Sequence, residues 1–127
     1  MGFRIAMGSG RCAELSSNSN SRVHELCSRI LGRVAHLQAL PAESLLALPS
    51  EATTTERIEA QIVSFTTYNE PLHEHDRLLV VQGFLPSWRY PRYFGPAGIG
   101  FMVAEGLVLH RDGSRTAAPD DLLWPFR

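Results

Sequence analysis

The densest group of residues that could do chemistry is a segment of thirteen residues from Pro86 to Gly98. It holds four of the chain's eleven aromatic residues and two of its arginines. Trp, Tyr and Arg dominate the energetics of protein interfaces because they bury a large surface yet keep a polar tip. Arginine can also hold a carboxylate or phosphate through two parallel hydrogen bonds. The candidate binding residues, which we name the Arg/aromatic segment, are Trp88, Arg89, Tyr90, Arg92, Tyr93 and Phe94.

Three interpretations of the Arg/aromatic segment stay open. Its rings could simply cover the sheet, it could bind a protein partner, or Arg89 and Arg92 could hold a small anion. Long connections in small domains often carry function. We expect a contact surface for a protein partner, most simply a second copy of the chain in a homodimer.

Glu105 is the only charged residue in the apolar run from Ile99 to Leu109. On strict alternation it points into a core or a pocket together with Val103 and Leu107. A carboxylate in such a place must be paired or take up a proton, and a general acid or base uses the second property. Glu105 is therefore the candidate acid/base or polar anchor. Alternatively, a bulge at the following glycine turns it to solvent, or an arginine pairs with it for structural reasons.

Two histidines, His73 and His75, stand two residues apart in a polar loop. On an extended strand two histidines at this spacing lie on the same side and could share a metal, with His110 or Glu105 as a further ligand. Because the pair lies in a loop rich in charge, we expect a solvated loop without a metal. No motif indicates a cofactor, and the chain has no lysine for a P-loop or a Schiff base.

The two cysteines, Cys12 and Cys27, form no CxxC pair and have no zinc-site spacing. Cys27 falls on the apolar stripe of a predicted helix. We therefore expect a reduced core thiol rather than a disulfide or a nucleophile.

Composition excludes several classes of protein. The 127 residues include 44% hydrophobic and 20% charged residues with a net charge of −1, which suits a single globular domain. All twelve basic residues are arginine, which indicates codon bias in a GC-rich, bacterial genome. They are dispersed and matched by acids, which argues against nucleic-acid binding. No apolar run is long enough for a membrane span or a signal peptide, so a cytoplasmic location is expected.

The firmest predicted element is a helix that begins at Asn20 or Ser21 and stops before Pro41. Its apolar stripe faces the sheet, and three arginines take the water-facing side. The stripe consists of Val23, Leu26, Ile30, Val34 and Leu37; the arginines are Arg22, Arg29 and Arg33. A short second helix runs from Pro41 to Leu48.

The second half of the chain predicts a curved antiparallel sheet of about four strands. Residues 50–55 are expected to be a linker, and a bulge near Ile62 explains a change in the phase of alternation. A turn around Gly113 leads to a short returning strand, and a final helical turn docks Leu122, Leu123 and Trp124 on the core. The prediction is a single α+β domain over 21–127, preceded by a flexible arm over 1–20.

These observations favour a non-enzymatic protein that binds another protein or itself through the Arg/aromatic segment. The alternative is a small pocket enzyme or ligand-binding α+β roll, in which Glu105 is the chemical group and a small anion is the ligand.

Overall fold

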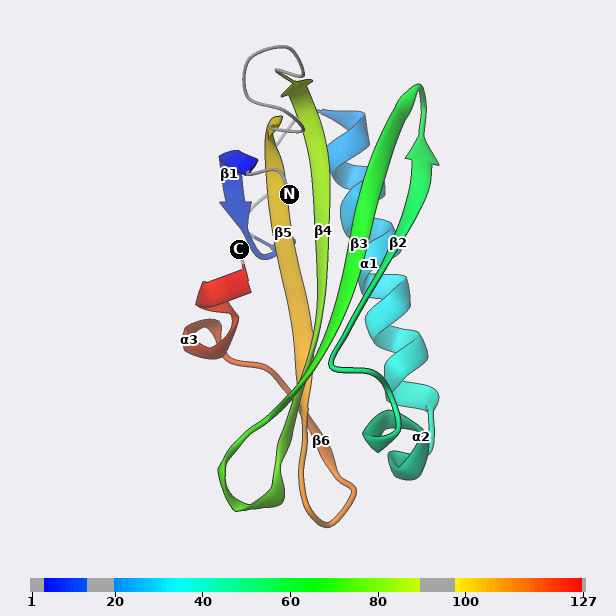
Figure 1. Cartoon of the computed structure of the whole chain (residues 1–127), viewed down its shortest axis with the longest axis vertical. Helices are drawn as coiled ribbons and strands as arrows, with labels where there is room; N and C mark the ends of the chain where they lie inside the picture. Colours follow the sequence, from blue (N-terminus) through cyan, green and yellow to red (C-terminus); the bar gives the residue numbers. More distant parts are fainter. Residues whose placement is uncertain (1–3, 14–19, 90–97, 127) are drawn as a thin grey trace.

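The computed structural model describes residues 4–13, 20–89 and 98–126. Helices α1 (Ser21–Ala39) and α2 (Ala42–Leu46) pack on an antiparallel sheet formed by the second half of the chain (Figure 1). The predicted α+β class is therefore confirmed. No helix in these described ranges is long and apolar enough to cross a membrane.

The sheet has five antiparallel strands and one parallel strand, where about four were expected. Strands β2 to β5 form a meander in which each strand pairs with the next, while β1 and β6 share the outer edge of β5. The strands are β1 (Arg4–Gly10), β2 (Glu51–Ile58), β3 (Gln61–Pro71), β4 (Arg77–Arg89), β5 (Gly98–Leu109) and β6 (Arg115–Ala117).

Helix α1 follows the predicted spacing. The side chain of Asn20 caps it by accepting a hydrogen bond from the backbone N–H of Arg22. Val23, Leu26, Ile30 and Leu37 are buried against the sheet, and Val34 packs against the same core. The helix packs tightly on the sheet at Gly83, where an added Cβ would lie 2.7 Å from the Cδ1 atom of Ile30.

The arginines of α1 differ from the prediction, because they do not simply face water. The guanidinium of Arg29 donates to Glu56 at 3.0 Å and to Glu25 at 2.9 Å. Arg33 also pairs with Glu56, and its guanidinium lies 4.5 Å from the centre of the Phe65 ring. The arginines of the helix therefore contact both strands of the hairpin formed by β2 and β3.

The expected linker over 50–55 and the expected bulge near Ile62 are both wrong. Residues 51–58 form β2, which pairs with β3 in a continuous register. A turn at Glu59 and Ala60 explains the change of phase, and Glu59 adopts a φ of 54° there. Thr53 to Thr55 are exposed, so this strand of β-branched residues carries no apolar alternation that would reveal it.

The first residues also depart from the expectation of a flexible arm. Arg4–Gly10 form β1, which pairs in parallel with the first half of β5. Strand β6 pairs with the last residues of β5 on the same edge, from Leu107 onward. Between them, Arg11 and Cys12 lie beside Glu105.

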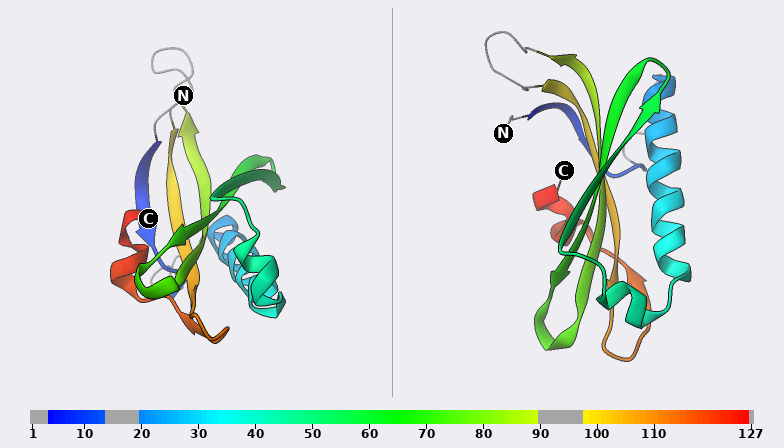
Figure 2. Two further views of the ribbon diagram at one scale, coloured as in Figure 1. Left: turned by 60° about the horizontal axis from the view of Figure 1, so that its bottom comes forward. Right: turned by 45° about the vertical axis from the view of Figure 1, so that its right-hand side comes forward.

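The two faces of the sheet carry two separate cores (Figure 2). One face is covered by α1 and α2. On the other, α3 (Asp120–Leu123) and the 3-10 turn η2 (Trp124–Phe126) cover Leu78, Val80 and Val108. Leu123 is buried as predicted, but Trp124 is 67% exposed, because η2 turns Phe126 toward the sheet instead.

Candidate functional site

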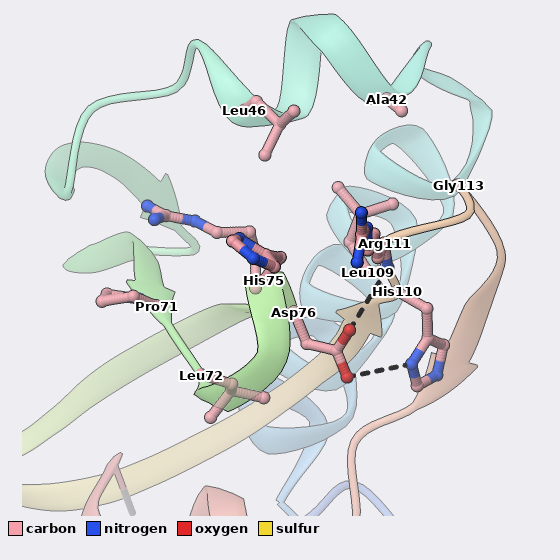
Figure 3. A pocket seen from close by; sticks show the side chains of 11 residues that line it. Ala42, Leu46, Pro71, Leu72, His75, Asp76, Leu109, His110, Arg111 and Gly113 are labelled. Carbon is pink, nitrogen blue, oxygen red and sulfur yellow. Dashed lines mark hydrogen bonds and ion pairs between the residues drawn. The ribbon is translucent and has the colours of Figure 1, made fainter.

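A pocket of about 590 Å³ lies at the end of the sheet where β4 begins and β5 ends (Figure 3). Helix α2 borders it on one side and the turn between β5 and β6 on another. Its wall combines apolar side chains with two arginines, two histidines and one aspartate. The lining residues are Ala42, Leu46, Pro71, Leu72, His75, Asp76, Arg77, Leu109, His110, Arg111 and Gly113.

The short connection between β3 and β4 carries the first group of polar residues. It contains the 3-10 turn η1 (His73–His75) and is closed by a hydrogen bond of 2.8 Å from the N–H of Leu72 to the carbonyl of Asp76. His75 adopts a φ of 69°, a left-handed conformation that a non-glycine residue holds only where its surroundings enforce it. The tight turn thus presents an exposed imidazole to the pocket (Figure 3).

Asp76 joins this turn to the turn after β5. One carboxylate oxygen accepts the backbone N–H of Arg111 at 3.2 Å, and the other lies 3.2 Å from Nδ1 of His110 (Figure 3). The second ring nitrogen of His110 lies 2.9 Å from the hydroxyl of Thr116 on β6. The chain of contacts fixes the imidazole of His110 from both sides, so its ring is held in one orientation.

The turn after β5 is itself well ordered by hydrogen bonds. Gly113 adopts a φ of 90°, as the sequence predicts for this turn. Asp112 accepts hydrogen bonds from the hydroxyl and the N–H of Ser114, and these lower the pKa of the Asp112 carboxyl. These hydrogen bonds fix the backbone of the turn that carries Arg111 at the edge of the pocket.

Arg77 is positioned by a buried amide. Asn69 is 1% exposed, and its amide nitrogen donates to the carbonyls of Leu45 and Leu48 at the end of α2. Its amide oxygen accepts a hydrogen bond of 3.0 Å from Nε of Arg77. Asn69 thus ties α2 to the sheet and aligns one of the two guanidinium groups of the pocket.

The charges of the pocket are not balanced within it. Among the side chains that the structure describes, Asp76 is the only acidic one in the pocket wall, and it is engaged by His110 and a backbone N–H. Neither Arg77 nor Arg111 forms an ion pair with any carboxylate among the described residues. The pocket therefore offers two guanidinium groups that a bound anion could neutralise.

The structure brings together only part of the histidine set considered from sequence. His75 and His110 line the same pocket, whereas His73 lies in η1 without lining it. Within the described residues, no group of three or more His, Cys, Asp or Glu side chains could hold a metal ion.

Glu105 is buried, with 8% of its surface exposed, and it does not line this pocket. Its Oε2 atom accepts hydrogen bonds from Nη2 and Nε of Arg11 at 2.8 and 3.2 Å. Its Oε1 atom accepts the backbone N–H of Cys12 at 2.9 Å. The register of β4 and β5 is continuous at Gly106, so no bulge turns Glu105 to solvent. The other alternative, pairing with an arginine, is the one that the structure shows. Arg11 also donates to the carbonyl of Ala118 and to Asp120.

The Arg/aromatic segment is described only in part. Trp88 and Arg89 belong to the end of β4, which is longer than the sequence indicates. Tyr90, Arg92, Tyr93 and Phe94 lie outside the described residues. The end of β4 that carries Trp88 pairs with the start of β5, at the opposite end of the strands from the pocket.

Sequence reasoning missed Arg77, Arg111 and the role of Asp76. One signal was available: Asp76 and Arg111 lie in the connections after β3 and after β5, and Arg77 begins the strand that follows the first of them. Comparisons of the chain with family models, with curated proteins and with solved structures find no match.

Proposed function

We propose that the protein binds a small carboxylate with a short hydrocarbon body in the pocket beside His75 and Arg111. The observation that carries the proposal is that Arg77 and Arg111 both line one cavity, and neither has a carboxylate partner among the described residues. A guanidinium can hold a carboxylate with two parallel hydrogen bonds. On this proposal the protein binds a ligand, as in the alternative that the sequence left open. The binding residues are Arg77 and Arg111, however, and not Glu105.

The apolar wall supplies the second part of the argument. Leu46, Leu72 and Leu109 lie around the charged groups, and a cavity of about 590 Å³ is of the size that small-molecule sites have. Each methylene group that leaves water for such a wall contributes about 0.8 kcal/mol. A carboxylate with a short chain therefore fits this pocket better than a bare anion does.

Calorimetric titration with hexanoate tests the proposal, with acetate and hexanol as controls. We expect hexanoate to bind more tightly than either control, because acetate lacks the hydrocarbon body and hexanol lacks the charge. Arg111→Ala is expected to weaken hexanoate binding about tenfold or more, since a hydrogen bond to a charged group contributes about 1.5–3 kcal/mol.

Arg57→Ala is the matched control, because Arg57 is exposed on β2 and does not line the pocket. It should bind hexanoate like the unaltered protein. Equal losses in Arg57→Ala and Arg111→Ala, or no loss in either, would contradict the proposal.

A second candidate function is association with a protein partner, or with a second copy, through the Arg/aromatic segment. The position of Trp88 and Arg89 at the sheet end opposite the pocket favours it, because a partner there would leave the pocket open. We expect Trp88→Ala combined with Tyr90→Ala to weaken association by a few kcal/mol, measured by sedimentation equilibrium, because aromatic anchors commonly contribute that much.

Trp124→Ala is the control for this experiment, since Trp124 is exposed elsewhere on the surface. It should leave association unchanged, and both variants should keep their melting temperature. If the double variant instead unfolds the isolated chain, its rings belong to the core and the second candidate function is wrong.

A further inference from the structure

The two cysteines, fifteen positions apart in the sequence, lie in contact in the fold. Cys12 follows β1 and is 9% exposed, and Cys27 lies on α1 and is partly buried against the same core. The Sγ atom of Cys12 lies 3.9 Å from the backbone carbonyl oxygen of Cys27, and each thiol changes the pKa of the other. Both are free.

The contact makes the two thiols unequal. The interaction with the Cys12 thiol lowers the pKa of Cys27, against the opposing effects of burial and of Glu105 on β5. The interaction with Cys27, followed by burial, raises the pKa of Cys12; Glu105 adds to this rise and Arg11 opposes it. Cys27 is therefore the cysteine of the pair that loses its proton more readily.

We propose that Cys12 and Cys27 form a redox modification site, which hydroperoxides oxidise to a reversible disulfide between the β1 segment and helix α1. The thiolate of Cys27 attacks one oxygen of the peroxide, which gives a sulfenic acid at Cys27 and releases hydroxide or alkoxide. The sulfur of Cys12 then attacks the sulfenic sulfur. Its proton leaves with the hydroxyl group as water, and a disulfide remains. A dithiol reductant restores both thiols by exchange.

The disulfide would act on the edge of the sheet. Cys12 follows Arg11 directly, and the backbone N–H of Cys12 is bonded to Glu105. A covalent bond to α1 would fix this segment to the helix. It would also lower the conformational entropy of the unfolded chain, because it closes the loop between the two cysteines, and this stabilises the folded state. We expect the melting temperature of the oxidised protein to rise by roughly 10 °C, and to return on reduction.

The test treats the full chain with one equivalent of hydrogen peroxide and then alkylates the remaining thiols. We expect loss of both free thiols, a mass lower by two hydrogen atoms, and a crosslinked peptide pair containing Cys12 and Cys27 within a single chain. Dithiothreitol should reverse all three. Disulfide-linked dimers, or two thiols that remain free after treatment, would overturn the proposal.

Single variants separate the roles of the two sulfurs, and their melting curves show that they are folded. In Cys12→Ala, we expect dimedone to trap a sulfenic acid at Cys27. The alkylation of Cys27 should also require a higher pH, because the Cys12 side chain that lowers its pKa is gone. In Cys27→Ser, Cys12 should react at least tenfold more slowly than Cys27 does in the unaltered protein. Equal reactivity of the two cysteines would count against the proposal. If a variant fails to fold, the crosslinked peptide from the unaltered chain decides alone.

Discussion

Replacing Ile30 by alanine is expected to lower the free energy of unfolding by about 2–5 kcal/mol. Ile30 is fully buried at the centre of α1, where the helix meets Gly83 on β4. The substitution leaves a cavity that the rigid sheet cannot close. Urea denaturation followed by circular dichroism measures the change, which should appear as a lower midpoint with an unchanged slope.

Leu31→Ala is the matched control on the same helix, because Leu31 is 49% exposed. Its cost should stay below about 1 kcal/mol, since surface substitutions away from special features have small effects. If the two variants cost the same, α1 does not pack on the sheet through the face described above.

Replacing Glu105 by alanine is expected to lower the free energy of unfolding by about 2–4 kcal/mol. The change removes the acceptor for two hydrogen bonds from Arg11 and one from the buried N–H of Cys12. It leaves that N–H without a partner in a buried place, and it removes the carboxylate that accepts two of the hydrogen bonds of Arg11. Thermal and urea unfolding measure the loss.

Glu25→Ala provides the comparison, because Glu25 forms an exposed ion pair with Arg29. Exposed pairs contribute less than about 1 kcal/mol, so this variant should remain close to the unaltered protein. If Glu105→Ala were as stable as Glu25→Ala, the contacts of Glu105 would not hold β1 and β6 on the edge of β5. Glu105 would then return as the candidate chemical group of the alternative function.

Much of the fold could be predicted because burial imposes periodicity. The stripe of α1, the apolar run of β5 and the turn at Gly113 each follow from local patterns that the structure retains. Strand β2 could not be found in this way, since its threonines are exposed and show no apolar alternation. Strand β1 depends likewise on the free edge of β5, which no local pattern reveals.

The candidate site was predictable only in fragments. His75, Asp76 and His110 attract attention in sequence as polar residues near one another or at a strand end, but the chemistry considered for the histidines was a metal site, which was not expected to form. The important property, two arginines without a carboxylate partner in the described part of the chain, depends on where the acidic residues lie in the fold. Trp124 shows the same limit, because a helical turn alone does not determine which of two aromatic residues turns toward the sheet.

Carboxylate binding in the pocket is the central claim, and a nuclear magnetic resonance titration tests it most directly. Amide proton and nitrogen shifts are followed while hexanoate is added to uniformly labelled protein. The proposal predicts saturable shifts at five residues that line the pocket: His75, Asp76, Arg77, His110 and Arg111. It also predicts that these shifts disappear in Arg111→Ala. Shifts confined to Trp88, Arg89 and the first residues of β5, or no saturable shifts at all, would contradict the claim.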